Sequence, residues 1–339
     1  RSNLRSNLEV VFKNIIIIPS NSIHRFLFAF DVFKIFCKLS RNNWRPNLIT
    51  TQNPWGEAFI SLVFSKIFGC PFMCQIHTDI LSIHWIKQNP ILNFFRLIQS
   101  FIILNLSTSI RTVSKGITLK LIRVFKINRN KFKIIPVGIT IKNKNLNNII
   151  KGKSIDPKNR IKILYVGRFS REKNLNLWLD TAFLVLKKYK KLEFILLGEG
   201  QEYNHIKNRI KKHKNNENFY LPGLTSYKEL TKYYQESNIL LLTSFYEGFG
   251  RVILEAMNFG IPCITTNSEG PKDLIKNKIN GYIVNTKDPY KLSKYLIKLI
   301  QEKKLYSTMS KNCLSIANTK YSFTKISKSY IQTMIDIMN

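Results

Sequence analysis

The second half of the chain alternates short aliphatic segments with longer amphipathic ones, and this alternation restricts the possible folds more than any other feature. Apolar runs at 161–166 and 192–197 predict buried strands, and the segments that follow them, 175–189 and 201–212, predict helices. Parallel strands need a crossover of about a dozen residues or more, which such helices supply. The pattern continues to residue 302, with further strands expected at 219–221, 239–243, 261–265 and 281–284 and further helices at 227–236 and 289–302. We therefore predict a doubly wound parallel α/β sheet within residues 155–320.

The first half has the same character in a less regular form. The chain of 339 residues is long enough for two domains, and the Asn- and Lys-rich stretch 140–160 predicts a linker between them. We expect a second Rossmann-like domain over 1–145. Because the sequence begins with Arg1, we also expect the start of this domain to be missing. The predicted strands are 11–18, 46–51, 71–76, 109–114 and 132–137, and the predicted helices are 22–40, 56–68 and 91–106.

The chain is strongly basic, with 54 Lys and Arg against 20 Asp and Glu and a formal net charge of +34. Nucleic-acid binding would explain this charge, but the sequence has no zinc-ligand spacing, no RNP-like aromatic motif and no isolated basic tail. Two explanations remain, namely attraction to an anionic membrane surface or phosphorylated substrate, and a compositional drift towards Lys, Asn and Ile. We favour drift combined with membrane attraction and expect no nucleic-acid partner.

Two segments of the first half are apolar without being membrane spans. The segment 22–40 carries scattered charges and predicts a one-sided helix, packed on a sheet or lying on a membrane. The segment 91–106 is the most hydrophobic of the chain, but it is short and interrupted by Arg96 and Gln99, so we expect a buried or interfacial helix.

Cysteine usage and the absence of a targeting segment bear on location. The five cysteines are odd in number and match no zinc spacing, which favours buried thiols in a reducing compartment. No signal-peptide pattern is visible. We expect a cytoplasmic protein, peripheral on the inner face of the membrane.

Ligands of open α/β sheets bind beyond the carboxyl ends of the strands, so the loops after the strands are the candidate site. The loop after 161–166 begins with Gly167 and carries Arg168 and Lys173, two cations that suit a diphosphate. The alternative is one more basic loop in a basic protein. Further loops rich in Gly, Pro or charge follow the next strands, at 198–200, 222–224 and 267–271, and together they predict one ligand cleft.

A second candidate is the stretch from Glu247 to Glu255. Gly248, Phe249 and Gly250 stand where a helix begins, and a helix N-terminus with exposed backbone amides binds anions. A Gly-x-Gly sequence before a helix is common, so this pattern alone is weak. Glu255, however, lies among apolar residues, and a buried carboxylate needs a partner.

In combination, these segments resemble a known family. GRFSREKN, LLGEGQE, LPGLTSYKEL and EGFGRVILEAMNFGIPCITTNSEGPKDLI follow, in order, the C-terminal half of retaining glycosyltransferases of family 4, including its Glu-x7-Glu spacing. The resemblance is close over about 150–310. It is weaker in the first half, where QNPWGEA, CQIHTD, RTVSKGI and IIPVGI look like the N-terminal domain of the family. It implies a GT-B fold, in which two Rossmann-like doubly wound domains face each other across a cleft and a last helix, 321–339, crosses back to the first domain.

The resemblance also implies roles for single residues. Arg168 and Lys173 would hold the diphosphate of a nucleotide sugar. Glu247 would contact donor-sugar hydroxyls and stabilise charge near the reacting carbon, and Glu255 would accept both ribose hydroxyls. The remaining positions are the backbone of Gly248, Phe249 and Gly250 at the sugar and β-phosphate, Gly223 and Leu224 beside the base, and His77 near the donor sugar and the acceptor hydroxyl.

The implied activity is transfer of a sugar from a nucleotide-diphosphate sugar to an envelope glycan or lipid-linked acceptor. Cations and a helix N-terminus can stabilise a departing diphosphate. As no Asp-x-Asp motif is present, we expect neither a metal nor a cofactor beyond the nucleotide sugar. Two alternatives stay open, a sugar-nucleotide epimerase of the same fold and a non-catalytic basic nucleotide-sugar-binding protein. One departure from the family is the stretch 19–22 after the first strand, which lacks glycine.

Overall fold

The second half of the chain forms a six-stranded parallel sheet in the computed structural model, which describes residues 10–12, 15–17, 28–41, 44–139, 153–285 and 288–339. Its strand order is β12-β11-β10-β7-β8-β9, and every pairing between these strands is parallel. The chain enters at the central strand β7, proceeds outward to β9, and returns to the other side of β7 at β10. The predicted doubly wound sheet is therefore confirmed. The strands are β7 (Ile161–Val166), β8 (Leu192–Leu197), β9 (Phe219–Gly223), β10 (Ile239–Leu242), β11 (Cys263–Thr266) and β12 (Gly281–Val284).

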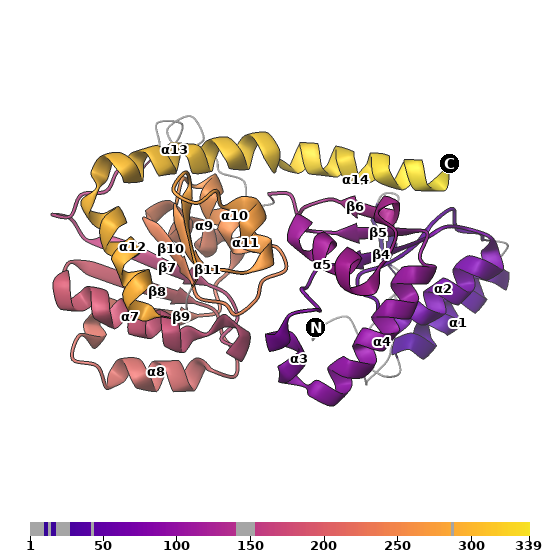
Figure 1. The fold of residues 1–339 in the computed structure, drawn as a ribbon, viewed down its shortest axis with the longest axis horizontal. Helices are drawn as coiled ribbons and strands as arrows, with labels where there is room; N and C mark the ends of the chain where they lie inside the picture. Colours follow the sequence, from indigo (N-terminus) through magenta and orange to yellow (C-terminus); the bar gives the residue numbers. More distant parts are fainter. Residues whose placement is uncertain (1–9, 13–14, 18–27, 42–43, 140–152, 286–287) are drawn as a thin grey trace.

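Helices connect these strands and cover the sheet (Figure 1). Particular residues fix where these helices begin and how they pack. Ser226 and Glu229 form a capping box that starts α9, each side chain binding the backbone amide of the other. Trp178 of α7 is fully buried, and its indole N–H donates to the carbonyl of Leu241 on β10 at 2.9 Å, which fixes α7 against the sheet. The helices are α7 (Leu175–Lys188), α8 (Tyr203–Lys211), α9 (Tyr227–Glu236), α10 (Arg251–Asn258), α11 (Glu269–Leu274), α12 (Pro289–Gln301) and α13 (Lys303–Lys320).

The first half forms a four-stranded parallel sheet of order β3-β4-β5-β6. Within the described residues its strands follow one another in chain order, without the reversal seen in the second sheet. The strands are β3 (Ile49–Thr51), β4 (Phe72–Ile76), β5 (Ser109–Thr112) and β6 (Phe132–Ile134). The helices around it are α1 (Phe28–Arg41), α2 (Glu57–Phe68), α3 (Ile83–Gln88), α4 (Pro90–Leu106) and α5 (Lys115–Phe125).

One predicted strand is wrong. The run 11–18 is not a single strand of the first sheet, because β1 (Val10–Phe12) and β2 (Ile15–Ile17) pair antiparallel with each other in a two-stranded sheet of their own. A run of β-branched residues favours extended backbone but does not specify its partner. The stretch 19–22 and residues 140–152 of the predicted linker lie outside the described residues.

The C-terminal helices run along both halves of the molecule (Figure 1). Helix α13 lies on the second domain, and α14 (Phe323–Met338) continues from it across the first domain. There the hydroxyl of Tyr330 accepts a hydrogen bond from the buried Gln75 of β4 at 2.9 Å, and the guanidinium of Arg111 on β5 lies 4.6 Å from the centre of the Tyr330 ring. The end of the chain thus becomes part of the first domain.

The five cysteines are free thiols, of which Cys74, Cys263 and Cys313 are buried while Cys37 and Cys70 are partly exposed. Burial raises the pKa of Cys74 to about 12. Among the described helices, none combines the length and apolar character that crossing a bilayer requires.

Candidate active site

The loops after β7 and β10 begin at neighbouring strands, at the point where the strand order of the second sheet reverses. Such a switch point is where open α/β sheets bind their ligands, because the two loops diverge there and leave a crevice. Lys173, from the loop after β7, places its Nζ 2.6 Å from Oε1 of Glu247, from the loop after β10. The hydroxyl of Ser244 donates to the same oxygen at 2.7 Å. Both charged side chains are largely buried, with 18% of Lys173 and 12% of Glu247 exposed.

Arg168 has a different environment from Lys173, although both belong to the same loop. Its side chain is 80% exposed and forms an ion pair with the mostly buried Glu172, with 3.0 Å between Nη2 and Oε1. Tyr165 fixes the backbone here, because its hydroxyl donates to the carbonyl of Arg168 at 2.7 Å. Of these two cations, Lys173 therefore lies inside the crevice and Arg168 at its edge.

The segment from Gly248 to Gly250 is held by close backbone contacts. Gly250 has φ of 84° and caps α10, a conformation that favours glycine. A Cβ on Gly270 would lie 2.5 Å from the backbone of Phe249, whose ring is buried against Tyr321. Among the described residues, no carbonyl or side chain accepts a hydrogen bond from the amides of Gly248, Phe249 and Gly250. The segment thus presents three backbone donors at the start of a helix.

His77 faces this segment from the first domain. A Cβ on Gly248 would lie 1.9 Å from the carbonyl oxygen of His77, so the backbones of the two domains touch at this point. Within the described part of the chain, the buried Nε2 of His77 has no hydrogen-bond partner. Burial, reinforced by the positive charge of Arg111, lowers the pKa of His77 to about 4. The imidazole is therefore neutral near pH 7, with one unpaired buried nitrogen.

Glu255 lies on α10 and is buried with both carboxylate oxygens occupied. Arg251, one turn earlier, donates from Nε to Oε1 at 2.7 Å, and the hydroxyl of Tyr234 donates to Oε2 at 2.9 Å. Tyr234 is completely buried, and burial beside this carboxylate raises its pKa well above the usual value. Two protein side chains thus supply the partners that this buried carboxylate needs, and no ligand is required for that.

The other predicted contacts lie at the ends of β8 and β9. Gly223 is the last residue of β9, with φ of 83°, and a Cβ there would lie 3.2 Å from Oε1 of Glu199. Leu224, the next residue, is exposed. The loops after β7 and β8 are packed closely, since a Cβ on Gly198 would lie 2.0 Å from the carbonyl oxygen of Gly167. The loops after β7, β8 and β9 therefore lie against one another at one edge of the sheet.

Further contacts join the two domains beside these loops. Lys120 of α5 lies 2.7 Å from Asp79, which follows β4, and 3.3 Å from Glu269 of α11. Burial lowers the pKa of Lys120, but the hydrogen bond to Asp79 and the two negative charges outweigh burial, and the net pKa is raised. This network holds α5 of the first domain against α11 of the second domain.

On the other side of the cleft, the ring of His84 on α3 stacks on Phe245, with 4.4 Å between centroids. A cavity of about 480 Å³ opens there between the domains. It is lined by His84, Lys87, Gln88, Arg171, Glu172, Gln201 and Phe245.

Comparison with known proteins identifies the second domain. Residues 147–314 match the family described as glycosyl transferases group 1. The second domain thus belongs to the group 1 glycosyltransferases. The assignment agrees with the segments noted in the sequence, since Arg168, Lys173, Glu247 and Glu255 all fall within the matched range.

Curated proteins similar to this chain include a poly(glycerol-phosphate) alpha-glucosyltransferase from Bacillus subtilis, 27% identical over 167 residues, which are 49% of this chain and 24% of that protein. An amylovoran biosynthesis glycosyltransferase from Erwinia amylovora is 31% identical over 145 residues, which are 42% of this chain and 40% of that protein. The chain spans about half the length, or less, of most of the curated relatives it matches.

Solved structures show the fold of the whole glycosyltransferase chain. Anabaena HepE in complex with UDP-glucose superposes with a TM-score of 0.74 at 18% identity, over 90% of this chain and 82% of that one. Sucrose-phosphate synthase from Thermosynechococcus elongatus superposes with a TM-score of 0.78 at 18% identity, over 93% of this chain and 80% of that one. The fold is GT-B, as predicted.

Several site residues were not predicted from the sequence. Arg251 stands four positions before Glu255 on the same helix, and this spacing was a usable signal. Tyr234, Ser244 and the network of Asp79, Lys120 and Glu269 gave no comparable signal. The partner of Tyr234 lies on another helix, and Glu269 meets Lys120 from the other domain. Ser244 stands only three positions before Glu247 in the same loop, but a loop serine does not by itself indicate such a contact.

Proposed function

We propose that this protein is a retaining glycosyltransferase that moves a hexose from a nucleotide-diphosphate sugar to an envelope glycan or a lipid-linked acceptor. The observation that carries the proposal is the arrangement at the switch point. There the Lys173–Glu247 ion pair lies beside the amides of Gly248, Phe249 and Gly250, which have no protein acceptor among the described residues. A cation and oriented amides suit a diphosphate, and the carboxylate suits sugar hydroxyls.

In this proposal, Lys173 and the three amides stabilise the diphosphate as its bond to the anomeric carbon breaks. Arg168, at the edge of the crevice, is assigned to the outer phosphate oxygens. The acceptor hydroxyl oxygen then bonds to the anomeric carbon, and its proton leaves with the diphosphate. These charges suffice for departure of the leaving group in the proposal, so transfer is expected to persist in EDTA, without a metal or further cofactor.

We assign His77 to the sugar. Its pKa of about 4 keeps the ring neutral at physiological pH, and its unpaired Nε2 can exchange a hydrogen bond with a hydroxyl of the donor or acceptor. A ligand hydroxyl there would satisfy a buried polar atom that has no partner among the described residues.

We assign Glu255 to the ribose, although both of its carboxylate oxygens already accept hydrogen bonds from the protein. Each carboxylate oxygen can accept more than one hydrogen bond, so ribose hydroxyls can bind beside Arg251 and Tyr234. Gly223 and Leu224 then border the base. The UDP and UDP-glucose complexes of Anabaena HepE, a protein of the same fold, support a nucleotide-sugar donor.

The acceptor side is supported by the relatives and by charge. One relative is named for poly(glycerol-phosphate) and another for amylovoran biosynthesis. Together with the basic charge of the chain, these relatives favour an acceptor of the cell envelope, reached by a cytoplasmic protein at the inner face of the membrane.

The test is a calorimetric and native mass-spectrometric screen of the full chain against UDP-, GDP- and ADP-sugars. We expect one nucleotide class to bind, Lys173→Met to weaken that binding, and Lys298→Met, which alters a surface ion pair remote from the cleft, to leave it unchanged. If folded protein binds none of them, the proposal fails. Product analysis by NMR with a lipid-linked acceptor should show the anomeric configuration of the donor retained. Donor turnover without any acceptor would instead indicate an epimerase.

A further inference from the structure

Helix α4 presents an apolar face to solvent along its whole length. Its exposed large side chains recur every three or four residues, which places them on one side of the helix. Ile91 is 76% exposed and Phe95 is 61% exposed, values that are unusual for such side chains in a soluble protein. The face includes Ile91, Phe94, Phe95, Ile98, Phe101 and Leu106.

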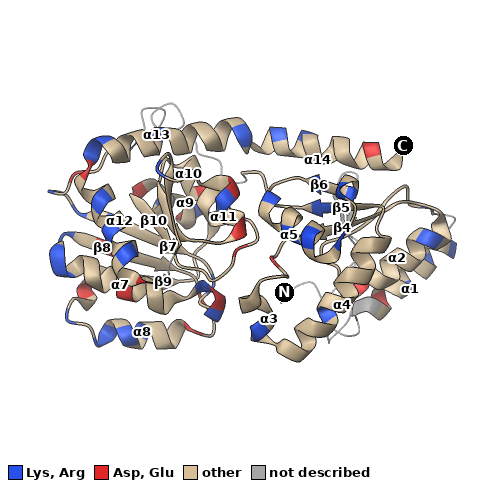
Figure 2. Cartoon of the chain, in the orientation of Figure 1, with Lys and Arg blue, Asp and Glu red and all other residues tan. Residues whose placement is uncertain are grey.

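The single charged residue of α4 does not interrupt this face. Arg96 donates from Nη1 to Oδ1 of the buried Asn93 at 3.0 Å, and its guanidinium lies 5.1 Å from the centre of the Trp55 ring. The charge is therefore directed towards the interior of the domain. In Figure 2 the ribbon of α4 is accordingly almost free of charged positions.

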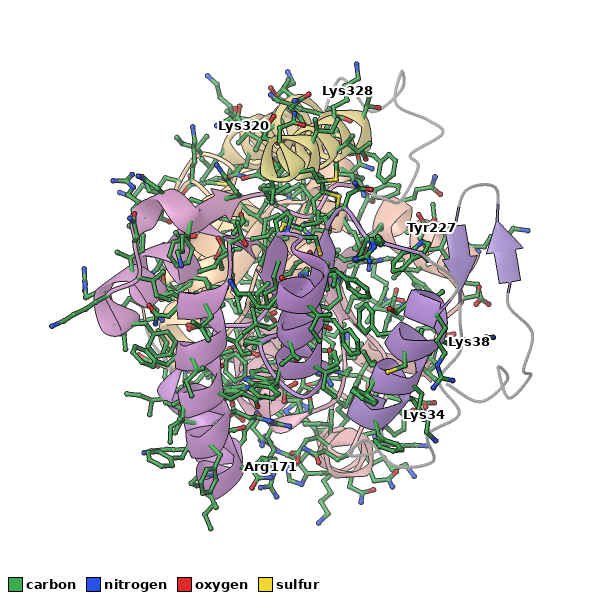
Figure 3. All side chains as sticks on the ribbon, turned by 90° about the vertical axis from the view of Figure 1, so that its right-hand side faces the viewer. Lys34, Lys38, Arg171, Tyr227, Lys320 and Lys328 are labelled. Carbon is green, nitrogen blue, oxygen red and sulfur yellow. The ribbon has the colours of Figure 1, made fainter. Side chains whose placement is uncertain are left out.

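The apolar surface continues onto α2, which packs between α1 and α4. Phe59, Val63 and Ile67 follow one another at intervals of four residues on α2, and all three are exposed. Figure 3 looks directly onto these three helices, which lie side by side. Exposed apolar residues on two neighbouring helices form a continuous patch, whereas soluble monomers usually expose such residues singly. We call this patch the α2–α4 face.

The charge around the α2–α4 face indicates what covers it. Residues 28–134 contain 15 Lys and Arg but only 3 Asp and Glu. Among these acids, Asp79 pairs with Lys120, and Glu57 accepts a hydrogen bond from Asn53. Exposed cations stand around the face, among them Lys34 and Lys38 on α1, labelled in Figure 3, and Lys66 on α2. Aromatic and aliphatic side chains within a rim of cations match an anionic bilayer.

The geometry of α4 fits a helix that lies in the interface. Its 17 residues span about 26 Å, and like the other described helices it lacks the combination of length and apolar character that crossing a bilayer requires. Its first turn adjoins α3, whose residues Lys87 and Gln88 line the cavity between the domains. A bilayer on the α2–α4 face would thus lie close to the mouth of the cleft.

We propose that the α2–α4 face inserts into the headgroup region of a bilayer containing anionic lipids and holds the cleft at the membrane surface. The proposal deepens the proposed transfer to a membrane-borne acceptor by naming the surface that reaches it. Its binding test, however, requires no sugar transfer.

The experiment is flotation of the full chain with vesicles of phosphatidylcholine alone and of phosphatidylcholine with 30% phosphatidylglycerol (roughly the anionic content of a charged leaflet). We expect binding to the anionic vesicles, weakened by salt. The neutral double variant Phe94→Ser with Phe95→Ser should lose at least about tenfold in affinity, because two rings no longer leave water. Tyr290→Ser, at an exposed aromatic of α12 in the other domain, should bind as the wild type does.

A second variant reports insertion directly. The fluorescence of Phe95→Trp, compared with Tyr290→Trp in the same vesicles, should be quenched more strongly by brominated lipids. The proposal is overturned if the wild type fails to bind anionic vesicles, or if the double serine variant binds equally well. A concentration-dependent dimer that the same variant abolishes would assign the face to a second copy instead.

These outcomes are separable from those of the nucleotide-sugar screen. A double serine variant that still binds the donor but no longer floats keeps the enzyme proposal and supports the α2–α4 face. If the wild type floats with the vesicles but binds no nucleotide sugar, only the proposal for the α2–α4 face stands.

Discussion

Lys173 and Glu247 neutralise each other across the switch point of the second sheet, with 2.6 Å between Nζ and Oε1. In the proposed reaction both have other partners, since Lys173 meets a diphosphate and Glu247 meets sugar hydroxyls. Donor binding would therefore redistribute an ion pair that already exists. In this proposal, the diphosphate would draw Lys173 towards itself and leave more of the carboxylate to the sugar.

This exchange predicts opposite effects for the two residues. Lys173→Met should weaken binding of a nucleoside diphosphate about tenfold or more, because a charge-assisted contact is lost. Glu247→Gln should bind the same diphosphate as tightly as the wild type or up to about tenfold more tightly, because Lys173 no longer has a competing partner. Sugar transfer should fall by about a hundredfold or more in Glu247→Gln. Calorimetry and a transfer assay measure the two effects, and an equal loss of both in Glu247→Gln would contradict this account.

A side chain at Gly248 should separate the domains. In Gly248→Ala the added Cβ would lie 1.9 Å from the carbonyl oxygen of His77, so the two backbones must move apart. We expect a large loss of transfer, a larger radius of gyration in solution scattering, and little change in unfolding of the separate domains. Gly69→Ala is the matched control. Its φ of +65° makes alanine strained by about 1 kcal/mol, but nothing lies within 4 Å of the new Cβ. If both variants behave alike, the contact between Gly248 and His77 does not control domain approach.

Removal of Lys120 should weaken the fold at the domain boundary. Lys120→Met leaves Asp79, whose side chain is 4% exposed, without its cation. We expect a loss of about 1–3 kcal/mol in the free energy of unfolding, measured by denaturant titration. Lys272→Met removes the other cation near Glu269, but Lys272 is 42% exposed, so the expected loss is about 0–1 kcal/mol. Equal losses in the two variants would show that burial of Asp79 is not the cause.

His77 should make stability depend on pH in the acid range. Its pKa is about 4 in the folded protein, against an ordinary value of 6.5 in the unfolded chain, so only the unfolded chain takes up a proton between these values. Stability is therefore full above pH 6.5 and is lost as the pH falls towards 4, by up to about 2 kcal/mol because the ring keeps some contact with water. His77→Gln should remove this component from the pH dependence of unfolding. NMR titration of the imidazole gives an independent value, and a midpoint near 6.5 would refute the assignment.

Most strands of the parallel sheets were predictable because they are largely buried. The strand 192–197 has apolar residues at nearly every position, and burial on both faces explains why. Helix α13 was not predicted. Its Ser, Asn, Thr and Lys residues suggest a polar segment, although Tyr306, Met309 and Cys313 on one face are buried. Its buried residues pack mainly against α10 and α12, and the polar sequence of the helix does not indicate this tertiary contact.

The candidate site was predictable only as far as its loops. Strand-end position and residue type indicated Lys173 and Glu247, but not that they bind each other, because 74 residues separate them. The sequence also indicated that a buried Glu255 needs a partner, but not that Tyr234 and Arg251 are its partners. Contacts of this kind depend on tertiary placement, which neither periodicity nor spacing encodes.

Helix α14 has a consequence for the order in which the molecule can be made. Its residue Tyr330 binds Gln75 and covers Arg111, both of which belong to strands of the first domain. A ribosome releases those strands some 220 to 250 residues earlier than α14 at the usual direction of synthesis. Until α14 has been synthesised, Gln75 and Arg111 therefore lack their contacts with Tyr330. The first domain emerges before the second, but its last contacts form after the second domain has been made.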